Sequence, residues 1–254
     1  MDKIKAFFSR IGMDENTIIH LNPVFLGRVQ TACVTFVAYE NLDILLGKPL
    51  SLDEDALFEK IVINRRGGYC FELNGLLSSM LSRMGFSVSE RFARFLRGER
   101  EIPMRRHRVA VVTLEDGDYF MDIGVGQVAP RLPIKMEEHL VQTQNGETYR
   151  FERDARHGWV LWELHHGAWR EYLAIPNDIA YPVDFLQPSF FCEKHPDSVF
   201  NKQRMIAVKT PSGRKTVDGN TYKVFDGETL IEIKENLRDE EITEILKNEF
   251  FLNV

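Results

Sequence analysis

The chain has 254 residues, and 44% of them are hydrophobic, which is enough to bury a large core and to build two or three structural units. Its net charge of −6 argues against nucleic acid as the main partner, because a phosphate-binding surface is basic. No run reaches the roughly 18 to 20 apolar residues of a membrane helix, and the N-terminus lacks an apolar signal core. We therefore expect a cytoplasmic protein without a membrane partner.

The first third of the chain is predicted to be helical. Pro23 precedes a helix whose apolar side chains recur at helical spacing, and Ser51-Leu52-Asp53-Glu54 matches a capping box that opens a second helix. A third helix is predicted from Cys70, with Gly85 as its C-cap. Its apolar stripe consists of Leu73, Leu76, Leu77, Met80, Leu81 and Met84.

Cys70 stands at the predicted start of this third helix, directly after Gly67-Gly68-Tyr69. Extending the apolar stripe back by one step places the thiol on the inward face, above the helix N-terminus. Free N–H groups and the helix dipole favour a thiolate there, and the glycines allow a tight turn before the helix. The sequence thus makes Cys70 a candidate nucleophile; the alternative is a small buried cysteine beside a loop.

A nucleophilic thiol needs a base, and the base needs an orienting group. His107 opens a predicted buried strand that continues to Leu114, whereas the other histidines lie in polar or turn-like contexts. Asp122 lies inside the next predicted apolar strand, 119–123, where an unpaired carboxylate would be costly, so His107 is its candidate partner. A simple hairpin turning at Asp116-Gly117 would leave the two about 13 Å apart along the strands. A different register, a bulge or a twist must bring them together.

The two remaining cysteines are predicted to pack in the core. Cys33 has helical spacing with Val29, and Cys192 follows Phe190-Phe191. Three scattered cysteines are too few for a disulfide framework or a zinc site, and we expect no metal.

The second half of the chain is predicted to form short strands and a closing helix. Strands are expected at 159–164 and 169–175, and Pro176 and Pro182 bracket a linker. Further strands are expected at about 205–208, 221–224 and 229–233, before a helix that starts at Asp239-Glu240-Glu241. Helices followed by strands and a mixed segment indicate an α+β fold.

These motifs, taken together, resemble the arylamine N-acetyltransferase family. The residues that carry the resemblance are Arg66-Gly67-Gly68-Tyr69-Cys70-Phe71-Glu72-Leu73-Asn74, His107 and Asp122-Ile123-Gly124, in the same order and at similar spacing. Tyr39-Glu40-Asn41-Leu42 is similar to the family's Phe-Glu-Asn-Leu segment, and 195–200 to its His-Pro-x-Ser-x-Phe segment. The similarity extends from about Tyr39 to Phe200.

The resemblance implies a fold, a reaction and a set of site residues. The fold is a helical bundle over residues 1–85, a β-barrel over 86–185 and an α/β lid over 186–254. The reaction is acetyl transfer from acetyl-coenzyme A to an aromatic amine or hydrazine by a cysteine-protease-like triad. The implied site residues are Cys70, His107 and Asp122 for catalysis, Tyr69, Val125, Phe191 and Phe200 for the acceptor, and Gly124, Gly126 and Gln127 for coenzyme A.

The chain also departs from the family pattern after the aspartate. The family usually continues Val-Gly-Phe-Gly-Gly, whereas here the segment is Ile123-Gly124-Val125-Gly126-Gln127. Val125 in place of the aromatic residue predicts a changed wall of the acceptor pocket. Gln127 in place of the second glycine predicts a stiffer loop near the coenzyme A phosphates.

Other readings stay open at this point. A related amide-forming enzyme of natural-product synthesis, a cysteine hydrolase or transglutaminase-like enzyme, and a catalytically silent binding protein would share much of this pattern. The short basic cluster Arg105-Arg106-His107-Arg108 is either a solvated loop or a contact for the coenzyme A pyrophosphate.

Overall fold

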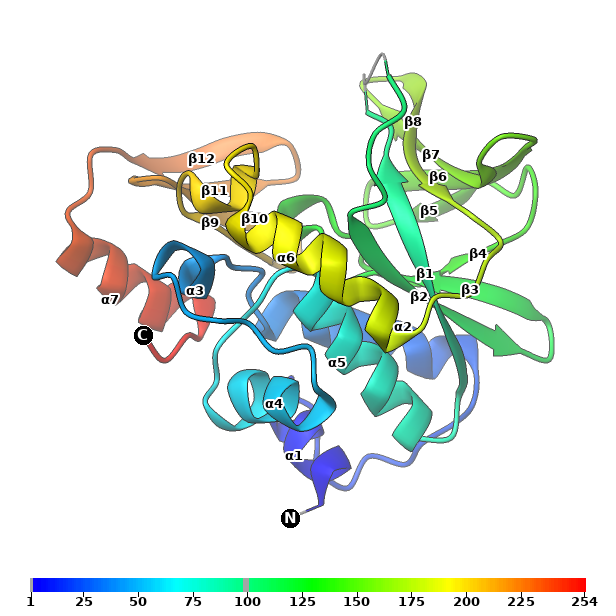
Figure 1. Ribbon diagram of the computed structural model, residues 1–254, viewed down its shortest axis with the longest axis horizontal. Coiled ribbons are helices and arrows are strands. Elements are labelled where there is room, and N and C mark those ends of the chain that lie inside the picture. The colour runs from blue at the N-terminus through cyan, green and yellow to red at the C-terminus, as the bar shows by residue number, and fades with distance from the viewer. Residues whose placement is uncertain (1, 98–100) are drawn as a thin grey trace.

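The computed structural model describes residues 2–97 and 101–254, and its N-terminal part is helical (Figure 1). The helices are α1 (Lys3–Arg10), α2 (Pro23–Phe36), α3 (Leu42–Leu45), α4 (Glu54–Phe58), which continues as a π-helical turn over Glu59–Ile63, and α5 (Cys70–Arg83). The predictions of a helix at Pro23 and of another from Cys70 are confirmed, although Pro23 is the first residue of its helix and does not precede it. The α4 cap differs, because Asp53 rather than Ser51 accepts the first N–H groups, those of Asp55 and Ala56.

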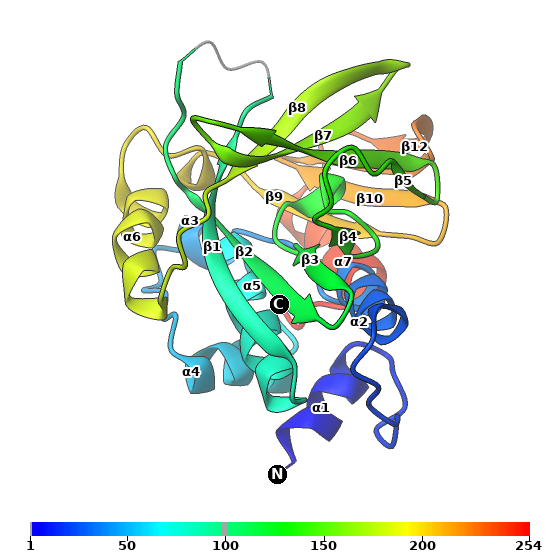
Figure 2. The same cartoon turned by 90° about the vertical axis from the view of Figure 1, so that its right-hand side faces the viewer.

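An eight-stranded antiparallel sheet follows, in the order β4-β3-β2-β1-β8-β7-β6-β5 (Figure 2). Its strands are β1 (Ser87–Phe95), β2 (His107–Leu114), β3 (Gly117–Met121), β4 (Ile134–Lys135), β5 (Gln142–Gln144), β6 (Glu147–Asp154), β7 (Gly158–His165) and β8 (Ala168–Ile175). The sheet curls so that its edge strands approach each other. The side-chain amide of Gln142 in β5 then accepts the N–H of Lys135 in β4 at 2.8 Å and donates to its carbonyl at 2.9 Å. The sheet is therefore a nearly closed barrel.

The last part of the chain forms helix α6 (Leu186–Lys194), a four-stranded sheet and helix α7 (Asp239–Phe250). The sheet contains β9 (Met205–Lys209), β10 (Gly213–Asp218), β11 (Thr221–Asp226) and β12 (Thr229–Lys234), each antiparallel to the next. Helix α6 and strand β10 are absent from the sequence-based expectations. In Figure 1 this sheet lies beside the barrel, and α6 crosses in front of α5.

Three groups of buried side chains make up the core of the described residues, and β2 separates two of them. Ala110 and Val112 face the helices, while Val109 and Val111 face the barrel interior. The third group joins α7 to the four-stranded sheet. No helix among the described residues is long and apolar enough to cross a membrane. The first residues of α5 and β2 thus meet where the helical part contacts the barrel.

Candidate active site

The loop before α5 passes too close to its neighbours to carry side chains at two positions. A Cβ on Gly67 would lie 2.1 Å from the carbonyl oxygen of Ala38, and one on Gly68 would lie 2.9 Å from the Cβ of Glu72. Neither glycine has a positive φ, and no turn occurs over residues 65–69, where Gly68 instead forms a β-bridge with Tyr39. The sequence-based reason for these glycines, a tight turn, is therefore wrong, and close backbone packing takes its place.

Buried ion pairs hold this loop. Arg66 contacts Glu40 at 3.2 Å, and Lys60 donates to Glu72 at 2.7 Å. The second carboxylate oxygen of Glu72 accepts the N–H of Tyr69, the N-cap residue, at 3.2 Å. Because both carboxylates are almost fully buried, these pairs fix the loop in one geometry and so fix where α5 begins.

His107 and Asp122 meet inside the protein. The Nε2 atom of His107 lies 2.7 Å from Oδ2 of Asp122, and both side chains are fully buried. The hairpin between them turns at Glu115-Asp116, with Leu114 opposite Gly117, one residue earlier than the register considered above. This register, extended past the last pair, brings Asp122 opposite Val109, about 7 Å along the strand from His107. The twist beyond the end of β3 closes the remaining gap.

Asp122 accepts two further hydrogen bonds, one of which comes from a residue that the sequence reasoning did not assign to the site. Asn74 Nδ2 donates to Oδ1 at 2.8 Å, and so does the N–H of Gly124 at 2.8 Å. Asn74 Oδ1 in turn accepts the N–H of Ile123 at 2.9 Å. Asn74 lies four residues after Cys70, so one face of α5 carries both. The sequence signal that could have assigned Asn74 to the site is this four-residue spacing, together with an amide on the apolar face of the helix.

Cys70 is only 3% exposed, and its Sγ lies 3.9 Å from the carbonyl oxygen of Arg106. Burial raises the pKa of the Cys70 thiol well above its ordinary value, and the neighbouring Cys192 and Asp122 raise it further. The N–H groups of Arg108 and Phe71 lower the pKa but do not offset burial. The N–H groups thus act in the direction expected from the sequence, but the helix N-terminus alone does not produce a thiolate. A nearby cation is required.

His107, the candidate base, is also the candidate for that cation. Nδ1 of His107 is buried and has no hydrogen-bond partner within the described part of the chain, while Nε2 is held by Asp122. A ring held in this way by a carboxylate can accept a proton on its free nitrogen, and the resulting imidazolium is stabilised by Asp122. The arrangement can thus take a proton from an acidic group beside it.

The aromatic residues assigned to the acceptor lie around α6. The Tyr69 side chain is fully buried, and its hydroxyl lies 2.6 Å from Oγ of Ser189 in α6. The Phe200 ring packs edge-on against Tyr69 with centroids 5.4 Å apart, and the Phe191 ring stacks on His195 at 4.2 Å. Tyr69 therefore fastens α6 to the loop before Cys70.

The loop after Asp122 runs from Cys70 toward the four-stranded sheet. A Cβ on Gly124 would lie 2.6 Å from the Cα of Cys70, so only glycine fits there. Gly126 has a positive φ of 59°, which also favours glycine. Val125 packs between the helical and the barrel parts of the core. Gln127 accepts a hydrogen bond from Arg214 of β10 at 3.1 Å.

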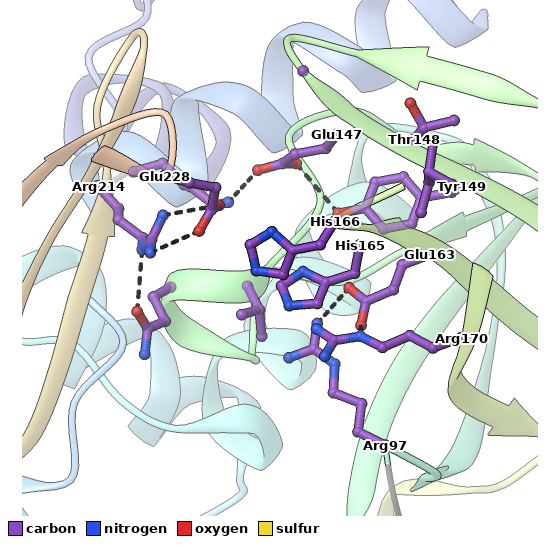
Figure 3. A pocket seen from close by; sticks show the side chains of 15 residues that line it. Arg97, Glu147, Thr148, Tyr149, Glu163, His165, His166, Arg170, Arg214 and Glu228 are labelled. Atoms are coloured by element: carbon purple, nitrogen blue, oxygen red, sulfur yellow. Dashed lines mark hydrogen bonds and ion pairs between the residues drawn. The ribbon is translucent and has the colours of Figure 1, made fainter. Parts of the chain in front are cut away.

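Gln127 also lines a polar pocket of about 370 Å³ between the barrel and this sheet (Figure 3). Most charges in this pocket are paired with each other. Glu163 contacts Arg97 at 2.5 Å and Arg170 at 2.6 Å, while Glu147 contacts Lys209 at 2.5 Å. The pocket thus has cationic groups in reach of an anion, but most of them already have a carboxylate partner.

One group of metal-ligating residue types occurs among the described residues, at Glu138, His139 and Glu152. It lies mostly exposed on the barrel, and internal contacts account for it. His139 Nδ1 contacts Glu152 at 2.6 Å, Glu138 accepts the N–H of Arg153 at 3.1 Å, and Arg150 contacts Glu152 at 3.0 Å. These contacts give no reason to place a metal there.

Comparison with known proteins agrees with the resemblance seen in the sequence. A family model described as N-acetyltransferase matches residues 25–254. An arylamine N-acetyltransferase of Mycobacterium bovis is 32% identical, with 87% of this chain and 79% of that protein covered. A Salmonella typhimurium protein named arylamine N-acetyltransferase / N-hydroxyarylamine O-acetyltransferase is 31% identical, over 84% and 75%.

Solved structures show the same likeness. The arylamine N-acetyltransferase of Salmonella typhimurium superposes with a TM-score of 0.94 at 26% identity, covering 99% of this chain and 92% of that one. The Mycobacterium marinum arylamine N-acetyltransferase in complex with CoA superposes with a TM-score of 0.89 at 27% identity, covering 98% and 92%.

Proposed function

The chain belongs to the arylamine N-acetyltransferase family and is an acyltransferase, and from this premise we propose a two-step reaction through an acetyl-Cys70 intermediate. The donor is acetyl-coenzyme A, and the acceptor is the nitrogen of an arylamine or arylhydrazine, or an N-hydroxyarylamine. The observation that carries the proposal is the buried 2.7 Å contact between His107 and Asp122, which leaves the other ring nitrogen without a partner in the described chain.

In the first step, His107 Nδ1 takes the proton of the Cys70 thiol, and the thiolate attacks the thioester carbonyl carbon. The N–H groups of Cys70 and Phe71, at the start of α5, are the candidate donors to the tetrahedral oxyanion. The carbon–sulfur bond of the donor then breaks. The coenzyme A sulfur leaves with the proton from His107, and acetyl-Cys70 remains.

In the second step, the acceptor nitrogen attacks the acetyl carbon of acetyl-Cys70. His107 takes a proton from the attacking nitrogen and returns it to the Cys70 sulfur as the thioester breaks. The acetylated amine leaves, and the enzyme is restored. Asp122 stays ionised in both steps, because it holds the ring in one orientation and stabilises the imidazolium.

The two substrates have separate proposed contacts. Gly124, Gly126 and Gln127 form the loop from Cys70 to the polar pocket in Figure 3, which we assign to the donor. The Mycobacterium marinum relative with bound CoA supports coenzyme A as donor. Tyr69, Val125, Phe191 and Phe200 are assigned to the acceptor side, with Tyr69 acting through its contact with α6. We also propose that the chain divides into structural units at residues 85 and 185 and that the protein is cytoplasmic.

The test is intact mass spectrometry after incubation with acetyl-coenzyme A alone. We expect the mass of one acetyl group on Cys70, no such gain in the Cys70→Ser variant, and loss of the group when an arylamine is added. Cys33→Ala and Cys192→Ala serve as matched cysteine controls and should still be acetylated. Donor turnover without an acceptor would indicate a hydrolase. Neither modification nor turnover would indicate a silent binding protein.

A further inference from the structure

Arg108 is the second residue of β2, directly after the candidate base His107, and it belongs to the basic cluster 105–108. The two alternatives considered for that cluster, a solvated loop and a pyrophosphate contact, both require an accessible side chain. Arg108 is only 4% exposed, so neither alternative applies to it. A charged guanidinium is costly to bury, and the contacts that compensate this cost indicate its role.

The guanidinium of Arg108 joins three parts of the chain. Its Nε and Nη2 atoms donate to one carboxylate oxygen of Glu90 in β1, at 2.9 and 2.6 Å. Its Nη1 atom donates to the carbonyl of Phe71, the second residue of α5, at 3.1 Å. The group also lies over the ring of Phe185, just before α6, at 4.6 Å from the ring centroid. Arg108 thus ties the first turn of α5 to β1 and β2, which lie beside it (Figure 2).

Gly75, in the interior of α5, leaves the space that this guanidinium occupies. A Cβ on Gly75 would lie 2.4 Å from Nη1 of Arg108 and 2.9 Å from its Cζ. Glycine weakens a helix interior relative to alanine, and Gly75 has no positive φ that would require it. The close approach of the Arg108 side chain is therefore the structural reason for this glycine.

The backbone of Arg108 reaches the reaction centre. Its carbonyl accepts a hydrogen bond at 2.5 Å from Nδ2 of Asn74, the same amide group that donates to Asp122. Its N–H is one of the two that lower the pKa of Cys70. A displacement of Arg108 therefore moves an acceptor for Asn74 and a donor to the Cys70 sulfur together.

Resting on the proposed function, we propose that Arg108 is a positioning residue for acetyl transfer, whose side chain sets the Cys70 end of α5 against the His107 end of β2. The ion pair with Glu90 holds one geometry, because either charge left alone in the interior would be strongly destabilising. The contact with the Phe71 carbonyl transmits that geometry to the first turn of α5. A misplacement of about 1 Å between two reacting groups is enough to slow a step about 100-fold.

The experiment follows iodoacetamide alkylation of Cys70 against pH, and acetylation by intact mass, in wild type, Arg108→Gln and Arg108→Lys. We expect Arg108→Gln to raise the midpoint of the alkylation profile by about one pH unit, because a misaligned donor to a thiolate lowers the thiolate population about tenfold. Acetylation at saturating donor should slow about 10- to 100-fold. Arg108→Lys should recover part of both losses, since it keeps the charge without the two-atom contact to Glu90.

Two further variants separate positioning from stability. Gly75→Ala keeps the charge of Arg108 but displaces its guanidinium, so it should shift the profile in the same direction as Arg108→Gln. Arg131→Gln is the matched control, because Arg131 is similarly buried and donates to the carbonyls of Thr210 and Gly213, at 2.6 and 2.7 Å, beside the four-stranded sheet. It should lower the melting temperature and leave the alkylation profile unchanged.

The alkylation profile decides the proposal. The variants change none of the other titratable groups near Cys70, which are His107, Asp122, Cys192, Tyr39 and Tyr69. An unchanged profile in folded Arg108→Gln, or an equal shift in Arg131→Gln, would overturn the positioning role. If Arg108→Gln does not fold in a melting experiment, Arg108→Lys and Gly75→Ala give the answer. Absence of acetylation in wild type would refute the proposed function, whereas alkylation needs no donor and still tests the placement of Cys70 against His107.

Discussion

The buried site around Cys70 and the polar pocket in Figure 3 contain similar types of side chain, but they differ in pairing. Charged groups in the polar pocket have partners, whereas a reactive atom at the Cys70 site has none in the described chain. The polar pocket holds more charged groups, and its carboxylates contact Arg97, Arg170, Lys209 and Arg214. The Cys70 site holds one histidine and one carboxylate, both fully buried, and the outer nitrogen of the histidine has no partner in the described chain. Chemical reactivity is thus indicated by burial with a missing partner, and not by the number of titratable groups.

Exposed and buried interactions also differ in the free energy that is lost when they are broken. An exposed ion pair contributes about 0 to 1 kcal/mol, because water solvates both charges almost as well when the pair is broken. A buried carboxylate that loses a hydrogen-bond donor pays a desolvation cost of about 1–3 kcal/mol or more. Changes at Asp122 and its neighbours should therefore have large effects on the chemical steps, and the loss of an exposed ion pair at the polar pocket should have a small effect on stability.

The largest effect is expected for Asp122→Asn. An amide neither fixes the His107 tautomer nor stabilises its charge, so we expect kcat/KM for arylamine acetylation to fall on the order of 10²–10⁴-fold, as in serine triads. Steady-state kinetics measures this, with circular dichroism to confirm folding. Asp197→Asn, at an exposed carboxylate, is the matched control. A folded Asp122→Asn variant with wild-type kinetics would remove Asp122 from the triad.

The next effect concerns the pH dependence of Cys70 alkylation in His107→Ala. Burial raises the pKa of Cys70, so without an imidazolium the thiolate fraction at pH 7 should fall below the roughly 3% of a free thiol with a pKa of about 8.5. We expect iodoacetamide to modify wild type below pH 7 and the variant only above about pH 8.5. Mass spectrometry of the Cys70 peptide follows the reaction. Identical profiles for the two proteins would rule out a thiolate–imidazolium pair.

A smaller effect is expected for Asn74→Ala. The variant removes one donor to Asp122 and leaves the N–H of Ile123 without its acceptor, so the carboxylate is held less firmly. We expect kcat to fall about tenfold and the free energy of unfolding to fall by about 1–3 kcal/mol. Kinetics and urea denaturation measure the two effects, and Asn248→Ala on the exposed face of α7 is the control. Loss of stability with unchanged kcat would show that Asn74 has a structural role only.

The smallest effect is expected for Glu228→Gln in the polar pocket. Glu228 is 72% exposed and contacts Arg214 at 3.2 Å, so breaking this pair should change the free energy of unfolding by less than about 0.5 kcal/mol. Acceptor kinetics should stay within about twofold of wild type. A rate loss comparable to that of Asp122→Asn would contradict the distinction between the two regions.

Elements with strong local signals were predictable from the sequence, and elements without them were not. Pro23 at a helix start and the apolar stripe after Cys70 predicted α2 and α5, because these signals lie within one or two turns. Helix α6 contains Pro188 and has no one-sided apolar stripe, so the sequence lacks the usual helix signals there. Strand β10 lies between a Pro-Ser-Gly turn and an Asp-Gly-Asn turn, and these turn signals obscure the short strand. Packing against other parts of the chain decides both elements.

The sequence by itself determined the family, the helix that begins at Cys70, and which histidine and aspartate to consider, because each depends on residue type and local spacing. Tertiary structure alone decided three further points. The hairpin register brings Asp122 to His107, Asn74 reaches across from α5 to hold that carboxylate, and Gly67 and Gly68 serve close packing rather than a turn. Burial also raised the pKa of Cys70 against the helix dipole. These outcomes depend on distances between segments far apart in the chain, and local sequence patterns do not contain those distances.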